Sequence, residues 1–226
     1  MRGMGKDESH LNPPSTGKRS ILHEEEIANS LSHGLGLLLA LVMVPVLLVS
    51  AMRIGRIGFM VGASIFAGTV VLLYLASTLY HALTHQRAKH FFRLFDHSAI
   101  FLLIAGTYTP FTLGVLRGPW GWTLLTIVWV LAVVGVVTKA VVGTRHSWFS
   151  MVLYLLMGWL AVVAVKPILL HVPLPGILLI LAGGVAYTSG LAFFAAPRLR
   201  YGHFIWHLFV VAGTTCHFFA VLWYAA

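Results

Sequence analysis

Seven apolar runs make up most of this chain, and each approaches the ~20 residues that a helix needs to cross a bilayer. Short polar loops separate the runs, so consecutive segments are expected to pack as antiparallel helices. The pattern predicts an all-α membrane protein with a seven-transmembrane helix bundle. The expected spans are 28–51, 57–83, 91–115, 120–140, 147–165, 175–196 and 202–224.

Two regions are therefore expected, a polar cytoplasmic tail over residues 1–27 and a transmembrane domain over residues 28–226. The tail ends in three consecutive acids, Glu24, Glu25 and Glu26. Because negative charge stabilises the start of a helix, these acids predict a short interfacial helix that begins there.

The composition excludes the usual soluble classes. Hydrophobic residues make up 59% of the chain and charged residues only 9%, whereas a soluble domain carries about 25% charged residues. The net charge of +9 is explained by basic residues that flank the spans, so no nucleic-acid partner is expected. The single cysteine, Cys216, excludes an internal disulfide and a multi-cysteine metal site.

The distribution of Lys and Arg predicts how the bundle is oriented. Four of the 15 basic residues lie on one side of the expected spans, and the other eleven share the side of the N-terminus. Since cytoplasmic loops carry the excess of positive charge, the N-terminus is expected in the cytoplasm and the C-terminus outside. The expected location is the plasma membrane, which is the inner membrane of a bacterium. The four residues are Arg53, Arg56, Arg117 and Lys166.

Polar residues from three spans are expected at one depth. His203 and His207 lie four residues apart in the first two turns of the last span, so both imidazoles share one helix face. Ser77 and His81 share a face in the last turn of the second span, and Asp96 lies in the second turn of the third. All five are expected within about 10 Å of the cytoplasmic surface.

Three neutral imidazoles with one open position are typical of a catalytic zinc site, where the pKa of bound water falls to about 7. A dication held by neutral ligands needs negative charge nearby, and Asp96 is the one carboxylate after residue 26. Asp96 is expected either to ligate the metal or to hold the water as a general base. Ser77 is a candidate to hydrogen-bond this water or a developing oxyanion.

Other interpretations of these residues remain open. Arg93 lies three residues before Asp96, so a buried ion pair explains the aspartate without a metal. His85 forms a second pair at helical spacing with His81, which allows a closed four-histidine structural site. Ser77 alone carries little information, because serine in a membrane helix often bonds to its own backbone.

Three further histidines are expected to play other parts. His97 points about 100° away from Asp96 around its helix, toward a neighbouring helix. His217 lies deep in the last span and is expected to be hydrogen-bonded within the bundle. His33, early in the first span, lies at the right depth to support the metal ligands.

The order of these motifs resembles the hemolysin III family, which is related to the progestin and adiponectin receptors and, more distantly, to the alkaline ceramidases. The resemblance covers essentially all seven expected spans. It is carried by Glu25-Glu26-Ile27-Ala28-Asn29, Ser32-His33-Gly34, Ser77-x3-His81, Asp96, the run from Leu103 to Phe111, and His203-x3-His207.

The resemblance implies a seven-helix bundle with an intracellular N-terminus, in agreement with the charge distribution. It implies Zn²⁺ bound by His81, His203 and His207, with Asp96 holding the zinc-bound water and Ser77 supporting it. It suggests hydrolysis of a lipid amide, as in ceramidases, with a membrane lipid as the substrate.

Two classes of function fit these expectations. The first is a zinc-dependent hydrolase of a lipid amide or ester, with acyl chains entering between the spans. The second is a non-enzymatic protein, membrane-lytic or receptor-like, with a structural zinc. A pore needs polar faces through the midplane, and the first, fourth and fifth expected spans offer almost none. A carrier needs ionisable groups across the whole membrane, whereas here they gather at one end.

Overall fold

The computed structural model describes residues 16–144, 147–196 and 198–226, and all the regular structure in these ranges is helical. The expectation of an all-α protein is therefore confirmed for the described part of the chain, while residues 1–15 of the expected tail lie outside it. The elements are α1 Thr16–Ile54, α2 Ile57–Ala82, α3 Gln86–Leu113, α4 Pro119–Val142, α5 Ser147–Gly158, a 3₁₀ segment η1 Leu160–Ala164, α6 Val165–His171, α7 Leu174–Phe194 and α8 Gly202–Tyr224.

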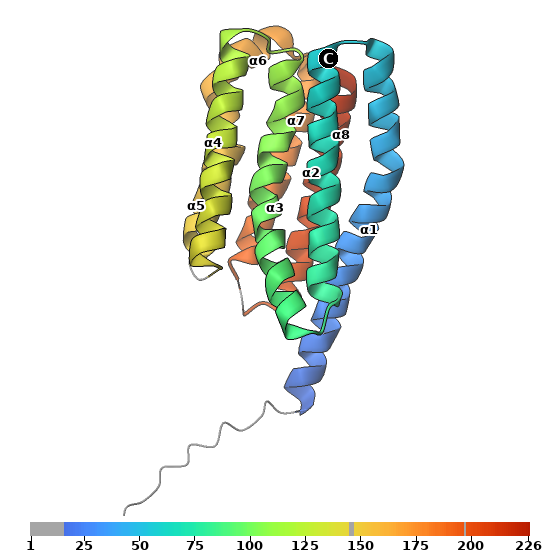
Figure 1. Ribbon diagram of the computed structural model, residues 1–226, viewed down its shortest axis with the longest axis vertical. Helices are drawn as coiled ribbons and strands as arrows, with labels where there is room; N and C mark the ends of the chain where they lie inside the picture. Colours follow the sequence, from blue (N-terminus) through green and yellow to red (C-terminus); the bar gives the residue numbers. More distant parts are fainter. Residues whose placement is uncertain (1–15, 145–146, 197) are drawn as a thin grey trace, which may run out of the picture.

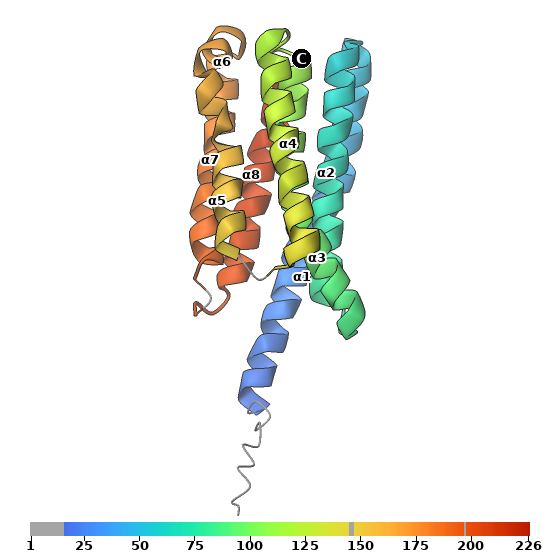
Figure 2. The ribbon, with the colours of Figure 1, turned by 60° about the vertical axis from the view of Figure 1, so that its left-hand side comes forward.

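The helices run side by side along one long axis and form a bundle (Figures 1 and 2). Along the chain α1 packs on α2, α2 on α3 and α3 on α4, and α8 returns to pack on both α7 and α1. The first turns of α1 project beyond one end of the bundle, and the C-terminus lies at the other end (Figure 1). The chain thus closes on itself, with α8 between the first helices and the last.

Among the described residues, six helical segments are long and apolar enough to cross a membrane, namely His23–Ile54, Ile57–Ala82, Pro119–Val142, Trp148–His171, Leu174–Phe194 and Gly202–Tyr224. The helix outside this set is α3, whose first half carries Arg87, Lys89, Arg93 and Asp96. With 28 residues, α3 is long enough to span a bilayer by itself, at 1.5 Å per residue. Its charged half lowers its mean hydropathy, and this same half carries the predicted carboxylate.

The fifth expected span is interrupted rather than continuous. α5 ends at Gly158, a 3₁₀ turn follows, and α6 then extends the segment to His171. The hydroxyl of Tyr108 on α3 fills the break, because it lies 2.9 Å from the carbonyl oxygen of Met157 and 3.0 Å from that of Gly158. The same oxygen accepts the N–H of Ala161 at 2.9 Å. A side chain from a neighbouring helix therefore replaces backbone bonds that the break leaves unmade.

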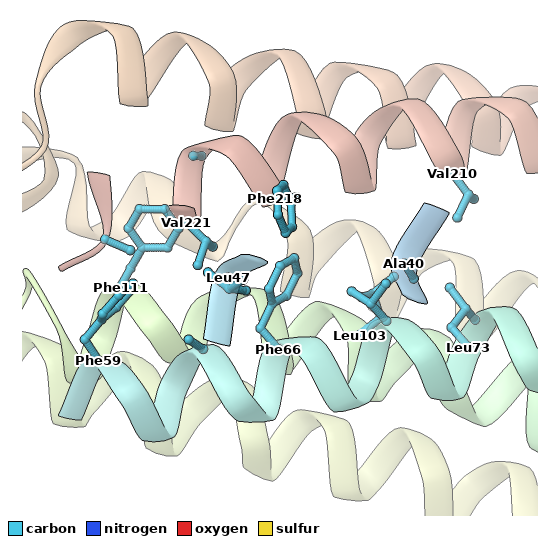
Figure 3. Close-up of a cluster of buried hydrophobic side chains, with 14 of the residues drawn as sticks. Ala40, Leu47, Phe59, Phe66, Leu73, Leu103, Phe111, Val210, Phe218 and Val221 are labelled. Atoms are coloured by element: carbon cyan, nitrogen blue, oxygen red, sulfur yellow. The ribbon is translucent and has the colours of Figure 1, made fainter. Parts of the chain in front are cut away.

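An apolar core joins α1, α2, α3 and α8 (Figure 3). Glycine lets α2 and α3 approach closely, because a Cβ at Gly62 would lie 2.5 Å from the Cα of Pro110. In a bilayer such contacts stabilise the bundle by close packing rather than by removal of apolar surface from water. The core positions the polar ends of these helices relative to one another. Its members include Ala40, Leu47, Phe59, Phe66, Leu73, Leu103, Phe111, Val210, Phe218 and Val221.

Candidate metal centre

Three histidines that lie far apart in the sequence meet at one end of the bundle. His81 comes from the last turn of α2, and His203 and His207 come from the first two turns of α8. One ring nitrogen of each lies within 4.8 Å of those of the other two. We call this group the histidine cluster. Its three imidazoles are the predicted metal ligands, and their arrangement is one that can hold a metal ion.

The outer side of His81 is held by a carboxylate. Its Nδ1 lies 3.0 Å from Oε2 of Glu26 on α1, and the same oxygen accepts from Lys89 at 2.9 Å. A carboxylate accepts hydrogen bonds, so Nδ1 of His81 carries the hydrogen and Nε2 keeps its lone pair. Nε2 is buried and has no hydrogen-bond partner among the described residues. This is the orientation in which imidazole binds a metal ion.

His207 is held in a similar way by α1. Its Nδ1 lies 3.1 Å from the carbonyl oxygen of Asn29 and 2.9 Å from Oγ of Ser32. Because a carbonyl oxygen only accepts, Nδ1 again carries the hydrogen and Nε2 remains available to a ligand. His33 stacks on the His207 ring, with 3.6 Å between centroids and 8° between planes. His33 thus supports the cluster, as its depth in the sequence predicted.

The start of α8 is also fixed by the acids of α1. Tyr201, the residue before α8, has a φ of 58°, and its N–H donates to Oε1 of Glu25 at 3.1 Å. Arg200 donates to Oε2 of Glu24 at 3.2 Å. α1 begins at Thr16, so the expectation that the acids form a first helical turn is wrong. They lie inside α1 and hold the loop that delivers His203 and His207.

Asp96 and Ser77 lie side by side on α3 and α2, at the same end of the bundle as the histidine cluster. Asp96 is 6% exposed and Ser77 fully buried, and apart from the neighbouring Asp96 the Ser77 hydroxyl has no hydrogen-bond partner in the described part of the chain. Asp96 lines the same cavity as His203 and His207, but it does not belong to the group of mutually close ligand atoms. The structure therefore brings all five predicted residues to one end of the bundle.

The alternative interpretations find less support. Between residues 23 and 226, as far as the structure describes them, Arg93 forms no ion pair with Asp96, and its Nη2 lies 3.4 Å from His90 instead. His85 precedes α3, where its Nδ1 accepts from the N–H of Ala88 at 3.5 Å. A buried Arg93–Asp96 pair and a closed four-histidine site are therefore absent from these residues.

A cavity of about 340 Å³ extends from the histidine cluster into the bundle. His33, Asp96, His203 and His207 line it at one end, and mainly apolar side chains line the rest. His97 also lines it, and its carbonyl oxygen accepts from Tyr154 at 2.8 Å. A site that opens into such a cavity can receive the polar group of an apolar ligand.

The residues that orient the imidazoles, Glu26, Asn29 and Ser32, were not among the predicted site residues. Their spacing of three along one helix was the available signal, because it places them on the same side of α1. These positions belong to the motifs that carry the family resemblance, and the structure shows that they contact His81 and His207.

The fold and these contacts define a class, an integral multi-pass helical membrane protein with clustered histidines at one end of its bundle. The chain belongs to the Haemolysin-III related family, whose model matches residues 22–218. It is 44% identical over 201 residues to Hemolysin-3 of Bacillus cereus, a match covering 89% of this chain and 92% of that protein. The Hemolysin-3 homolog of Bacillus subtilis (strain 168) is also 44% identical over 201 residues, with 89% and 94% covered.

A more distant relative comes from animals. The monocyte to macrophage differentiation factor of Homo sapiens is 24% identical over 168 residues, which cover 70% of this chain and 68% of that protein. This match agrees with the expected relation to the progestin and adiponectin receptors.

Proposed function

We propose that this protein is a zinc-dependent hydrolase of lipid amides, with a reaction like that of a ceramidase. The observation that carries this proposal is the convergence of three imidazoles at one end of a largely apolar cavity. In two of the rings one nitrogen is engaged by a neighbour, which leaves the other for a metal ion.

The donor set suits Zn²⁺. Three neutral imidazole nitrogens with a further position open toward a cavity match the catalytic zinc sites of proteins, and the chain has no second cysteine for a thiolate site. His81, His203 and His207 would hold the ion. Bound there, zinc would supply a Lewis acid that polarises the carbonyl group of the substrate.

The protein's own residues supply the proton transfer. We assign Asp96 as the general base, whose Oδ atom accepts a proton from the attacking water and returns it to the leaving amine. Ser77 is assigned to donate a hydrogen bond from Oγ to the developing oxyanion, because its hydroxyl is buried beside Asp96 without another partner. The carboxylate of Glu26 and the carbonyl oxygen of Asn29 keep the imidazoles of His81 and His207 in the tautomer that presents Nε2.

The shape of the cavity supports a lipid substrate. Several of its lining residues are also exposed on the outer face of the bundle, on α5, η1, α6 and α7. An acyl chain can therefore pass sideways from the bilayer into the cavity, with its amide group at the histidine cluster. The residues that are both lining and exposed are Leu155, Trp159, Val162, Leu169 and Leu181.

The proposal includes a topology of seven spans, with α3 as the third and with the N-terminus in the cytoplasm. α3 supports this view because it packs along α2 and α4, both of which are membrane-crossing by length and composition. The histidine cluster then lies near the cytoplasmic face of the plasma membrane. The excess of Lys and Arg at that end of the bundle agrees with this orientation.

A membrane-lytic or receptor-like protein with a structural zinc is the second candidate. It is favoured by the names of the bacterial relatives, which are hemolysins. A structural zinc site is normally closed by four protein ligands, whereas this cluster offers three and adjoins a cavity. The hydrolase is therefore the better supported of the two.

Metal content and turnover together test this proposal. Wild-type protein purified in detergent is expected to carry one Zn²⁺ per chain and to release fatty acid from a long-chain ceramide. His207→Ala is expected to lose both metal and activity, whereas His171→Ala, an exposed residue in α6 far from the cluster, should keep both. Asp96→Asn should keep the metal and lose hydrolysis.

Either of two results would contradict it. Stoichiometric zinc in His207→Ala would exclude the histidine cluster as the site. Zinc without hydrolysis of any N-acyl lipid in the wild type would favour the structural-zinc candidate.

A further inference from the structure

One face of α8 lines the cavity over most of its length. His203, Trp206, His207, Val210 and His217 all belong to the lining. At 100° per residue these five positions fall within an arc of about 100° around the helix. His217 follows His207 by ten residues, which is about 15 Å along the axis. α8 therefore presents imidazoles to the same cavity at two depths.

His217 is held against α7 in a defined orientation. Its Nε2 lies 3.1 Å from the carbonyl oxygen of Ile180, and its ring centroid lies 5.4 Å from that of Tyr187. Gly183 makes room for the ring, because a Cβ at this position would collide with the imidazole. These contacts fix the orientation of the imidazole, with Nε2 directed at the backbone of α7.

The other polar side chains at this depth already have partners. The hydroxyls of Tyr187 and Thr214 lie 2.8 Å apart, and Trp159 donates to Thr188 at 3.1 Å. Nδ1 of His217, by contrast, is buried without a partner. The remaining buried side-chain atoms without partners in the described residues belong to the helices that meet at the histidine-cluster end: Asn29, His33, Ser77, His81 and Arg93.

The hydrogen-bond partner of His217 determines what Nδ1 can bind. The carbonyl oxygen of Ile180 only accepts, so Nε2 must carry the hydrogen. The carboxylates of the described residues lie on α1 and at Asp96, so none is available to pair with a charged imidazole at His217. In the neutral ring Nδ1 is then a bare acceptor, which needs a hydroxyl or an N–H group.

We propose that His217 is a distal recognition point in the cavity, selecting a lipid whose chain carries a hydroxyl or amide N–H about 15 Å from the group at the histidine cluster. The inference rests on the proposed function for the amide end of the ligand. It goes beyond that function because it assigns the cavity a second polar contact. Chains with only an ether, ketone or carboxylate at this position cannot donate to Nδ1 and gain nothing from it.

Binding of three dodecanamides to the full-length protein in detergent tests the inference. The three differ only at the far end of the chain, which carries a hydroxyl, a methyl ether or no substituent. Their affinities are compared by displacement of a fluorescent fatty acid from the protein. The hydroxyl compound is expected to bind about three- to tenfold more tightly than the other two, as for one net hydrogen bond. Equal affinities, or an ether that binds as tightly as the hydroxyl, would overturn the inference.

A substitution assigns the preference to the imidazole. His217→Phe retains an aromatic ring but removes Nδ1, so the hydroxyl compound should fall to the affinity of plain dodecanamide, whose own binding should not change. A preference retained in a variant that is folded by thermal unfolding would also overturn the inference. If this variant does not fold, the ligand series on the wild type decides alone.

The readout separates this inference from the proposed function. Displacement requires neither metal nor turnover, so absence of hydrolysis would overturn the hydrolase while leaving the hydroxyl preference measurable. Hydrolysis of amides without any preference for the hydroxyl compound would support the hydrolase and overturn the distal recognition point. If none of the three dodecanamides displaces the fluorescent fatty acid, the distal recognition point is also contradicted.

Discussion

Nδ1 of His81 lies 3.0 Å from Oε2 of Glu26, and this oxygen also accepts from Lys89 at 2.9 Å. One carboxylate on α1 thus joins an imidazole on α2 to an ammonium group on α3. The arrangement ties three helices together at the histidine cluster. It also fixes the His81 tautomer, since the carboxylate accepts the Nδ1 hydrogen and leaves Nε2 free.

Glu26→Gln is therefore expected to weaken metal binding. Loss of a carboxylate that holds a metal-ligating histidine reduces affinity about 10- to 100-fold. The measurement is competition for Zn²⁺ with a chelator of known affinity, on protein in detergent. Glu24→Gln is the comparison variant and should reduce zinc affinity less, because Glu24 is more than half exposed and pairs with Arg200 before α8 without contacting the cluster itself. Equal zinc affinity in Glu26→Gln and wild type would remove Glu26 from the site.

Ser77→Ala is expected to lower the rate of catalysis while leaving the stability of the protein nearly unchanged. The Ser77 hydroxyl is buried beside Asp96 and has no other hydrogen-bond partner among the described residues, so its removal should change the melting temperature little. If Ser77 stabilises an oxyanion, kcat for ceramide hydrolysis should fall about 100-fold while zinc content is retained.

Ser64→Ala is the control for this prediction, because Ser64 lies exposed on the same helix and donates to its own backbone at Met60. It should leave kcat unchanged. An unchanged kcat in Ser77→Ala would mean that the hydroxyl takes no part in the reaction.

The sequence was sufficient to find the histidine cluster. His203 and His207 share a face because of their spacing, and His81 and Asp96 reach the same depth because each lies near the matching end of its helix. Periodicity and rise per residue depend only on local geometry, so depth along a helix can be read from sequence. Which side chains touch at that depth depends on how helices pack.

Glu26 and Tyr108 make contacts between helices that the residue pattern of one helix could not predict. Glu26 contacts His81 because the first part of α1 packs beside the last turn of α2, where Lys89 of α3 reaches the same carboxylate. The break after Gly158 is filled by the hydroxyl of Tyr108, which lies fifty residues earlier. His217 was expected to be fully hydrogen-bonded, but it is bonded on one side only. These features arise from contacts between helices that a pattern within one helix does not encode.

The approach of α2 to α3 gives a stability prediction. A Cβ at Gly62 would lie 2.5 Å from the Cα of Pro110 and 2.9 Å from the carbonyl oxygen of Thr109, both backbone atoms that cannot rotate away. Gly62→Ala is expected to destabilise the protein by about 2 kcal/mol, as for overpacked sites, and to lower its melting temperature in detergent.

Gly68→Ala provides the comparison for Gly62→Ala. Gly68 is on the same helix, and a Cβ there meets nothing within 4 Å. Alanine also favours the helical state, so this variant should be as stable as wild type or slightly more stable. Equal melting temperatures for the two variants would show that α2 and α3 are not packed as closely as the structure has them.

The proposed topology is tested at the two ends of α3. Gln86 lies exposed at its start and Arg117 lies exposed just after its end, so cysteines at these positions report whether α3 crosses the membrane. In a Cys216→Ser background, a membrane-impermeant maleimide applied to intact cells should label Arg117→Cys. It should label Gln86→Cys only after permeabilisation, because the proposed orientation places Gln86 in the cytoplasm. The reverse pattern would invert the bundle, and equal labelling of both positions would mean that α3 does not cross.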